Sequence, residues 1–240
     1  MPDLNGKVAI VTGSTKGIGR AIAQSLVDAG CRVVVTSRTE AAVEETAASL
    51  GELAVGIPCD VADPEACRAL VDESVRRLGR LDILVNNAGV GVFKPISEMS
   101  VEEWRRQVDV NLGGVFYCSK AALGPLSQSG DGFIINIGSL AGRNTFAGGT
   151  GYNASKFGLL GMTEAMMLDV RYDDIRVSII MPGSVNTPFN QREPSAERTW
   201  RLEPEDCALA VMQLLAYPRQ AHVSRIEMRP SQPNKGESRR

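Results

Sequence analysis

The sequence has very few residues of the kinds that build metal sites. It contains a single histidine, His222, and its five cysteines stand far apart between Cys31 and Cys207. Protein metal sites usually combine several histidine and cysteine ligands at short spacings, so we expect no metal site and a structural or surface role for His222. An odd number of scattered cysteines also gives no disulfide framework, which favours a reducing compartment such as the cytoplasm.

Long apolar runs and an excess of charge of one sign are also missing. No run approaches the roughly 20 apolar residues of a membrane-spanning helix, and no basic segment followed by an apolar one opens the chain. The net charge of −2 offers no attraction for nucleic acid or an anionic membrane. Aromatic residues make up only 5% of the chain, but a hydrophobic fraction of 43% can fill a core. We expect one soluble, cytoplasmic domain over residues 1–240, with a polar tail from about 230 to 240.

What the sequence does have is a regular alternation of short apolar runs and longer amphipathic stretches. The runs predict strands at 7–12, 31–36, 53–58, 81–85, 133–137, 175–180 and 223–228. Helical spacing predicts helices after the first strand and at 40–50, 63–78, 100–123, 152–170 and 203–215. This alternation predicts an α/β fold in three layers: a doubly wound parallel sheet of about seven strands with helices on both faces. Ligands of such sheets bind outside the carboxyl ends of the strands.

A glycine-rich turn follows the first predicted strand and opens the first predicted helix. Glycine permits a tight turn and a close approach of the backbone to pyrophosphate, and the helix N-terminus offers free N–H groups and partial positive charge. Such a turn could be purely structural, but the strand before it and the helix after it favour a dinucleotide site. The expected contacts are Gly13, Thr15, Lys16, Gly17, Ile18 and Gly19.

The end of the second predicted strand indicates which dinucleotide binds. A carboxylate there would hold a free ribose 2′-hydroxyl, but this chain has Ser37 and Arg38. A hydroxyl and a guanidinium can bind a 2′-phosphate through charge-assisted hydrogen bonds, and Lys16 adds a second cation. We therefore expect NADP(H) in preference to NAD(H). Glu40 argues the other way, because it could neutralise Arg38, and each basic residue could simply be solvated.

Tyr152 and Lys156 lie four residues apart in a predicted helix, so they share one face. A carbonyl that accepts hydride develops negative charge on oxygen, which needs a proton donor and a hydrogen-bond partner. A cation about 4 Å away contributes roughly 4 kcal/mol at an effective dielectric constant of about 20, or about three pKa units. Lys156 could therefore lower the pKa of Tyr152 from about 10 towards neutrality. An isolated pair could be an ordinary amphipathic face, but Ser139 ends the neighbouring predicted strand.

Together these motifs resemble the short-chain dehydrogenase/reductase superfamily, whose sheet is Rossmann-like, over nearly the whole chain. The resemblance is carried by the glycine spacing, Asp60, Asn86-Asn87-Ala88-Gly89, Asn111, Ser139, Tyr152 with Lys156, and Pro182-Gly183 through Thr187. It implies that Tyr152 is the acid–base and that Ser139 polarises the substrate oxygen. It also implies that Lys156 binds the nicotinamide ribose and that Asn111 supports a water-linked proton path.

The resemblance also implies cofactor contacts beyond the glycine turn. Asp60 would meet the adenine amino group, and we expect a cofactor role for Asn86 as well. The expected contacts are Ser37, Arg38, Asp60, Val61, Asn87, Ala88, Gly89, Tyr152, Lys156, Pro182, Gly183, Val185 and Thr187.

The substrate is a small carbonyl or alcohol compound that the sequence does not identify. In the resembled family the segment between Thr187 and Glu203 covers the substrate, and here it is short and polar, which implies an open site. Arg143 and Arg192 could meet an anionic substrate or only solvent. Residues expected at the mouth of the site are Leu140, Ala141, Arg143, Thr145, Phe146 and Phe189.

Several activities stay open. The ending Ile226–Pro230 departs from the Gly-Gly ending typical of 3-oxoacyl-carrier-protein reductases, so a general carbonyl reductase or hydroxy-acid dehydrogenase is favoured. A non-catalytic NADP(H)-binding sensor or scaffold would not need Ser139, Tyr152 and Lys156. An epimerase or dehydratase of nucleotide sugars would need more room than the short covering segment leaves.

The resemblance further implies a homo-oligomer, a tetramer or a dimer, in which the helices at 100–123 and 152–170 form a four-helix bundle with those of a second subunit. A helix that is apolar nearly all round must bury a second face, although one large core could also take up these residues. The apolar positions are Leu112, Val115, Phe116, Ala121, Leu159, Leu160, Met162, Met166 and Met167.

Overall fold

The computed structural model describes residues 2–189 and 200–233. Its seven strands form one parallel sheet in the order β3-β2-β1-β4-β5-β6-β7. The strands are β1 (Val8–Thr12), β2 (Arg32–Thr36), β3 (Ala54–Gly56), β4 (Ile83–Asn86), β5 (Gly132–Ile137), β6 (Ile175–Pro182) and β7 (Arg225–Met228). The strand order reverses between β1 and β4, where such sheets bind their ligands, so the doubly wound sheet predicted from the alternation is confirmed.

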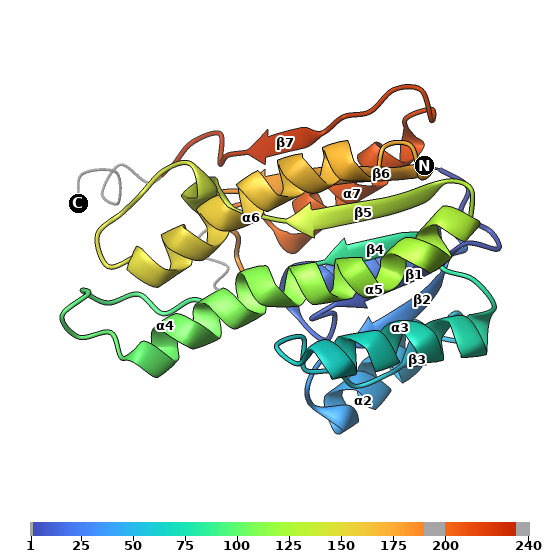
Figure 1. Cartoon of the computed structure of the whole chain (residues 1–240), viewed down its shortest axis with the longest axis horizontal. Coiled ribbons are helices and arrows are strands. Elements are labelled where there is room, and N and C mark those ends of the chain that lie inside the picture. Colours follow the sequence, from blue (N-terminus) through green and yellow to red (C-terminus); the bar gives the residue numbers. More distant parts are fainter. Residues whose placement is uncertain (1, 190–199, 234–240) are drawn as a thin grey trace.

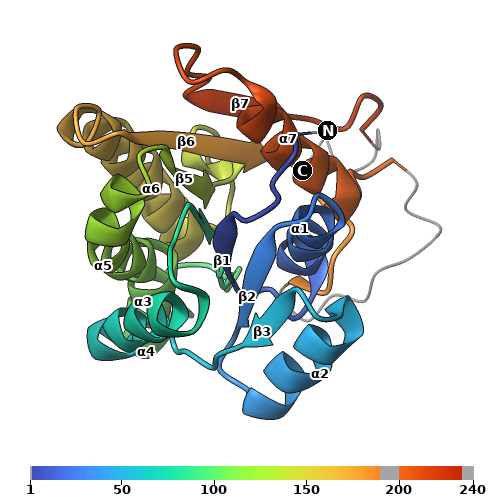
Figure 2. The same ribbon diagram turned by 90° about the vertical axis from the view of Figure 1, so that its right-hand side faces the viewer.

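Helices cover both faces of the sheet (Figure 2). On one face lie α1 (Gly17–Asp28), α2 (Glu40–Leu50) and α7 (Pro204–Ala216). On the other lie α3 (Pro64–Leu78), α5 (Gly114–Gln128) and α6 (Thr150–Asp169). In line with α5, α4 (Val101–Val108) extends beyond the carboxyl ends of the strands (Figure 1). These bounds agree with the periodicity of the sequence to within a few residues at each end.

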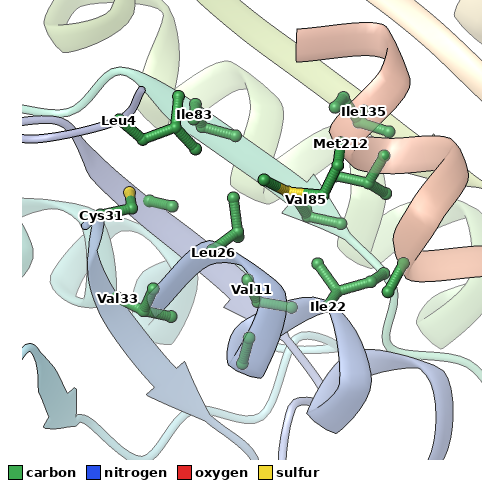
Figure 3. Close-up of a cluster of buried hydrophobic side chains, with 14 of the residues drawn as sticks. Leu4, Val11, Ile22, Leu26, Cys31, Val33, Ile83, Val85, Ile135 and Met212 are labelled. Carbon is green, nitrogen blue, oxygen red and sulfur yellow. The ribbon is translucent and has the colours of Figure 1, made fainter. Parts of the chain in front are cut away.

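Two apolar layers hold the helices on the sheet. Successive side chains of a strand point to opposite faces, and a parallel strand covered on both sides can be apolar throughout. In β1, Val11 packs against Ile22 and Leu26 of α1 in one layer, while Ile10 belongs to the opposite layer with Leu70 of α3. Figure 3 shows the first layer, with Met212 of α7 closing it.

The helix expected over 100–123 runs further and is interrupted. Ser100 begins it with a capping box: its hydroxyl accepts from the Glu103 N–H at 3.2 Å, and the Glu103 carboxylate accepts from the Ser100 N–H at 2.9 Å. A π-helical segment, η1 (Asp109–Gly113), separates α4 from α5, which continues to Gln128. Isolated π-helical turns are common at functional sites, and this one contains Asn111.

The cysteines lie in the interior of the fold, whereas the histidine is exposed. All five cysteines are buried and reduced, and His222 Nε2 lies 2.9 Å from the Val177 carbonyl oxygen. Within residues 2–189 and 200–233, no group of three or more His, Cys, Asp or Glu could hold a metal ion. In the same two ranges, no helix combines the length and the apolar character needed to cross a membrane.

Candidate active site

A cavity of about 890 Å³ opens beyond the carboxyl ends of the strands. One end, which we call the nucleotide end, is formed by the loops after β1, β2 and β3. The other, the reaction end, is formed by the loops after β4 and β5 and the start of α6. Nearly every predicted cofactor contact lines this cavity: Gly13, Thr15, Lys16, Gly17, Ile18, Ser37, Arg38, Asp60, Val61, Asn87, Ala88, Gly89, Tyr152, Lys156, Pro182, Gly183, Val185 and Thr187.

The glycine turn shapes the wall between β1 and α1. Gly13 and Gly17 have φ values of 65° and 54°, in the left-handed region that L side chains rarely adopt. A Cβ on Gly13 would lie 2.9 Å from the Ala88 Cα. Gly19 lies behind the cavity wall, where a Cβ would come within 2.4 Å of both the Gly13 carbonyl oxygen and the Asn87 amide. Gly19 therefore lets α1 pack closely against the turn and is not among the lining residues.

The nucleotide end brings together the basic residues expected there. The Ser14 N–H donates to the Thr36 carbonyl at 3.1 Å, and the Thr36 N–H donates to the Ser14 hydroxyl at 2.9 Å. These bonds hold the glycine turn beside the end of β2, so that Lys16 and Arg38 line the same cavity. Among the ion pairs within the described ranges, none involves Lys16, Arg38 or Glu40. Glu40 does not neutralise Arg38 in this structure.

The structure at the end of β4 shows that the expected cofactor role of Asn86 is wrong. Asn86 is buried in the sheet, where its amide donates to the Ser119 hydroxyl at 3.0 Å and to the Asn136 carbonyl oxygen at 2.9 Å. Because alternate residues point to opposite sides at this point of the chain, it is Asn87 that reaches the cavity. The Asn87 amide donates to the Thr12 carbonyl at 2.8 Å, which fixes the loop after β4 to the end of β1.

Asp60 and Val61 extend the nucleotide end beyond β3. The Asp60 carboxylate accepts from the Ala62 N–H at 3.1 Å, so it caps its own loop while it lines the cavity. On the opposite wall, Gly183 donates its N–H to the Met228 carbonyl at 2.8 Å. That bond ties the turn after β6 to β7 and places Val185 and Thr187 along the cavity.

Ser139, Tyr152 and Lys156 meet at the reaction end. Ser139 follows β5, and its hydroxyl accepts from the Ala141 N–H at 3.1 Å. Tyr152 lies in the first turn of α6 and lines the cavity together with Ser139. Lys156, one turn further on, is only 5% exposed; its ammonium donates to the Ile137 carbonyl at 3.0 Å and lies 5.9 Å from the centre of the Tyr152 ring.

Burial governs the ionisation of the pair. It raises the pKa of Tyr152, against the smaller opposite effect of the neighbouring Ser139 hydroxyl, and it lowers the pKa of Lys156 to about 8. The pKa of Tyr152 is therefore not brought down towards neutrality, contrary to the expectation from the neighbouring Lys156. The ammonium is directed at the Ile137 carbonyl, and desolvation of the phenol dominates. Tyr152 consequently keeps its proton at neutral pH.

Asn111 lies behind the cavity and is not among its lining residues. Its amide donates to the Val90 carbonyl at 2.8 Å and to the Ser155 hydroxyl at 3.0 Å, and its carbonyl oxygen accepts from the Val90 N–H at 2.8 Å. The π-helical segment thereby ties the loop after β4 to the helix that carries Tyr152 and Lys156. Gly89, which lines the cavity, lies next to Asn111. A Cβ on Gly89 would lie 3.4 Å from the side-chain carbonyl oxygen of Asn111 and 3.9 Å from the Lys156 ammonium.

The mouth of the site is more apolar than the sequence indicated. Leu140, Ala141, Thr145, Phe146 and Phe189 line it as expected. Arg143 does not, because its guanidinium lies 2.7 Å from the Glu227 carboxylate. Arg192 and the other residues of the proposed covering segment from 190 to 199 lie outside the described residues.

Further lining residues were not anticipated from the sequence: Phe93, Asn144, Trp200, Arg201, Pro230 and Pro233. Phe93 could have been suspected, because it follows Asn87-Ala88-Gly89 in the same loop. Trp200 and Pro230 carried no comparable signal, since only the packing of the segments after β6 and β7 brings them to the cavity.

Comparisons with known proteins agree with this arrangement. The model of the short chain dehydrogenase family matches residues 7–198. A 3-oxoacyl-[acyl-carrier-protein] reductase of Vibrio cholerae is 34% identical over 231 residues, which cover 92% of this chain and 94% of that protein. The chain therefore belongs to the short-chain dehydrogenase family and is an oxidoreductase of that family.

Two solved structures share the fold over nearly their whole length. An alcohol dehydrogenase from the archaeon Thermococcus sibiricus, complexed with 5-hydroxy-NADP, superposes with a TM-score of 0.89 at 30% identity, covering 95% of this chain and 99% of that one. A metagenomic short-chain oxidoreductase in complex with NADP gives a TM-score of 0.84 at 35% identity, covering 96% and 100%.

Proposed function

We propose that the protein is an NADP(H)-dependent oxidoreductase that interconverts a carbonyl compound and a secondary alcohol, with Tyr152 as the acid–base. The observation that carries the proposal is one continuous cavity, with a glycine turn and two cations at one end and Ser139, Tyr152 and Lys156 at the other. A protein that only bound the dinucleotide would have no need of a proton donor at the far end.

The nucleotide end fits NADP(H). Lys16 and Arg38 supply positive charge that Glu40 does not neutralise, and Ser37 lines the cavity next to Arg38. Such groups bind a 2′-phosphate through charge-assisted hydrogen bonds. The two solved relatives described above are complexed with NADP or a derivative of it. When bound, the cofactor supplies the hydride.

The reaction end fits proton transfer to a carbonyl oxygen. Tyr152 holds a proton at neutral pH because burial raises its pKa, and it can donate that proton as negative charge develops on the substrate oxygen. Ser139 can donate a hydrogen bond to the same oxygen. Lys156, still largely protonated at pH 7 with a pKa of about 8, stabilises the phenolate that Tyr152 leaves. Asn111 holds α6 in position through its hydrogen bond to Ser155. It can do so whether or not it also supports a water-linked proton path.

The proposal is tested by following NADPH absorbance with a panel of ketones, with NADH in parallel. Reduction of at least one ketone, faster with NADPH, is the expected result. Tight binding of NADPH without turnover of any carbonyl or alcohol would contradict the enzymatic assignment and would indicate a sensor or scaffold.

We also propose a homo-oligomer that pairs α4, α5 and α6 between subunits. Several of the apolar residues first considered for this contact fill the core instead, because Val115 and Leu159 are buried and Met166 and Met167 pack against the α3 layer. The support comes from Phe116 and Phe157, which remain 48% and 42% exposed on α5 and α6. Sedimentation at micromolar concentration tests this, and a fully active monomer would refute it.

The five reduced cysteines favour a compartment that keeps thiols reduced. We propose the cytoplasm as the place of action. Cell fractionation of the native host tests this, and recovery from an oxidising compartment would contradict it.

A further inference from the structure

Three phenylalanines gather around the reactive tyrosine. The Phe93 ring centre lies 5.3 Å from that of Tyr152 and 5.5 Å from that of Phe146, and the Phe189 ring centre lies 5.8 Å from that of Tyr152. All three rings line the cavity. They come from three separate loops, after β4, before α6 and after β6. Half of the six phenylalanines of the chain thus converge on one end of one cavity.

Close packing against glycines holds these rings in place. A Cβ on Gly91 would lie 2.8 Å from the Phe189 ring and 2.9 Å from the Phe93 ring. A Cβ on Gly149 would lie 2.8 Å from the Phe146 ring. The Lys94 N–H also donates to the Gly148 carbonyl at 3.0 Å, which joins the loop of Phe93 to the loop of Phe146. The aromatic wall is therefore formed before a substrate arrives, and such pre-organisation favours binding.

The cations near this wall are engaged elsewhere. The Arg143 guanidinium pairs with Glu227 at 2.7 Å, and the Lys94 ammonium pairs with Glu103 at 2.7 Å. The Lys156 ammonium is bound to the Ile137 carbonyl. Lys16 and Arg38 belong to the nucleotide end.

Arg201 is a further cation of the cavity lining. Its guanidinium lies 5.1 Å from the Trp200 ring centre. The neighbouring Leu202 exchanges backbone hydrogen bonds with Ser184 and Asn186, at 3.0 and 2.8 Å. This places the segment along the turn after β6. An anionic group placed directly against the three phenylalanine rings would exchange hydration for an apolar surface, which is costly.

We infer that the substrate carries an uncharged aromatic group close to its carbonyl, and that Phe93, Phe146 and Phe189 bind that group beside Tyr152. The inference rests on the proposed carbonyl reduction and names its substrate class. Aromatic rings attract one another in tilted and edge-to-face arrangements with centres about 4.5–7 Å apart. The rings of the wall already meet each other in this way, and Phe146, 45% exposed, leaves the outer side open for a further ring.

The first test compares three ketones that share a CH₃–CO–CH₂–CH₂ unit and differ only in the group attached to it. They are 4-phenylbutan-2-one, butan-2-one and 4-oxopentanoate, which carry a phenyl group, a hydrogen atom and a carboxylate. We expect kcat/KM for the phenyl ketone to exceed that for butan-2-one by about tenfold or more, with 4-oxopentanoate the poorest. Equal or better use of 4-oxopentanoate would overturn the inference.

The second test assigns the preference to the aromatic wall. Phe93→Ala should lower the ratio of kcat/KM between the phenyl ketone and butan-2-one by about tenfold, mainly through KM, and Phe93→Leu should lower it less. A general displacement of Tyr152 would instead slow both ketones equally and leave the ratio unchanged. The control is Tyr172→Ala, which removes an aromatic ring that is 89% exposed and outside the cavity. An unchanged ratio in Phe93→Ala would also overturn the inference.

The third test separates the substrate class from the reaction. Calorimetry on Tyr152→Phe saturated with NADPH measures the affinity for 4-phenylbutan-2-one and 4-oxopentanoate without turnover. Tighter binding of the phenyl ketone is expected. If the parent enzyme reduces no ketone but this preference is found, the proposed reaction fails and the ligand class stands. If ketones are reduced but the carboxylate binds as tightly, the ligand class fails and the reaction stands.

Discussion

The two ends of the cavity are built in different ways. The nucleotide end consists mainly of glycines and polar groups that follow one another within the short loops after β1, β2 and β3, and Arg38 is exposed there. The reaction end consists of buried or aromatic groups from distant parts of the chain, from Phe93 to Phe189. Local backbone geometry is enough for the first, whereas the second exists only when several loops pack together. Burial shifts the pKa of Tyr152 and of Lys156 at the reaction end, so the chemistry depends on packing far more than cofactor binding does.

The sharpest test of this difference is Tyr152→Phe. The substitution removes the proton donor and leaves the nucleotide end intact, so we expect turnover to fall by about 10² to 10⁴-fold with the Kd for NADPH changed less than about threefold. Steady-state kinetics and fluorescence titration measure the two quantities. Residual activity within a few-fold of the parent would show that another group supplies the proton.

The complementary change, at the nucleotide end, is Arg38→Asp. It exchanges a cation for an anion next to the expected 2′-phosphate, and each charge-assisted contact contributes about 1.5–3 kcal/mol. The preference for NADPH over NADH in kcat/KM should therefore fall by about tenfold or more, while the activity of Tyr152 towards ketones with NADH is retained. Arg143→Asp is the control, since Arg143 pairs with Glu227 outside the cavity. A parent enzyme that prefers NADH would contradict the prediction.

Gly19→Ala tests the packing of α1 against the glycine turn and the loop after β4. The new methyl group would meet the Gly13 carbonyl oxygen and the Asn87 amide at 2.4 Å, so we expect a loss of about 1–3 kcal/mol in the free energy of unfolding from overpacking. Gly161→Ala on α6 is the control. Nothing lies within 4 Å of its Cβ, and the helix should gain about 0.5–1 kcal/mol. Urea denaturation of both variants gives the comparison, and a stabilised Gly19→Ala would refute the packing argument.

The smallest expected effect is a pH dependence of the reaction end. Tyr152 stays protonated above neutrality because its pKa is raised, whereas Lys156 has a pKa of about 8 and loses its charge as the pH rises through that value. The kcat/KM for ketone reduction should therefore be level below about pH 7 and fall by a few-fold between about pH 7 and pH 9. In Lys156→Arg, the guanidinium stays charged, and the remaining activity should show no fall in that range. The same fall in that variant would assign it to another group.

Much of the nucleotide end could be predicted from the sequence because it is local. The spacing of Gly13 and Gly17 after an apolar strand already implies the backbone conformation that both glycines adopt, and Lys16 and Arg38 follow within or just after predicted elements. The pairing of Tyr152 and Lys156 could also be predicted from the sequence, since residues four apart in a helix share a face. Asn86 shows the limit of this reasoning: a shift of one residue at the end of β4 decides whether a side chain enters the sheet or the cavity.

Other features depended on contacts between remote residues. Arg143 is withdrawn from the mouth of the site by Glu227, 84 residues later. Asn111, in the π-helical turn, forms hydrogen bonds with Val90 in the loop after β4 and with Ser155 in α6. No periodicity in the sequence reports such pairings.

By itself the sequence determined the doubly wound sheet, the family and the residue types available at each strand end. The period of the hydrophobic residues and the positions of glycines determine local structure over a few consecutive residues, so their effect can be predicted from the sequence. Only the tertiary structure decided the direction of the Lys156 ammonium, the protonated state of Tyr152 and the enclosure of that tyrosine by Phe93, Phe146 and Phe189. Desolvation and side-chain packing depend on atoms brought together from distant segments, and those atoms become neighbours only when the sheet and its loops are assembled.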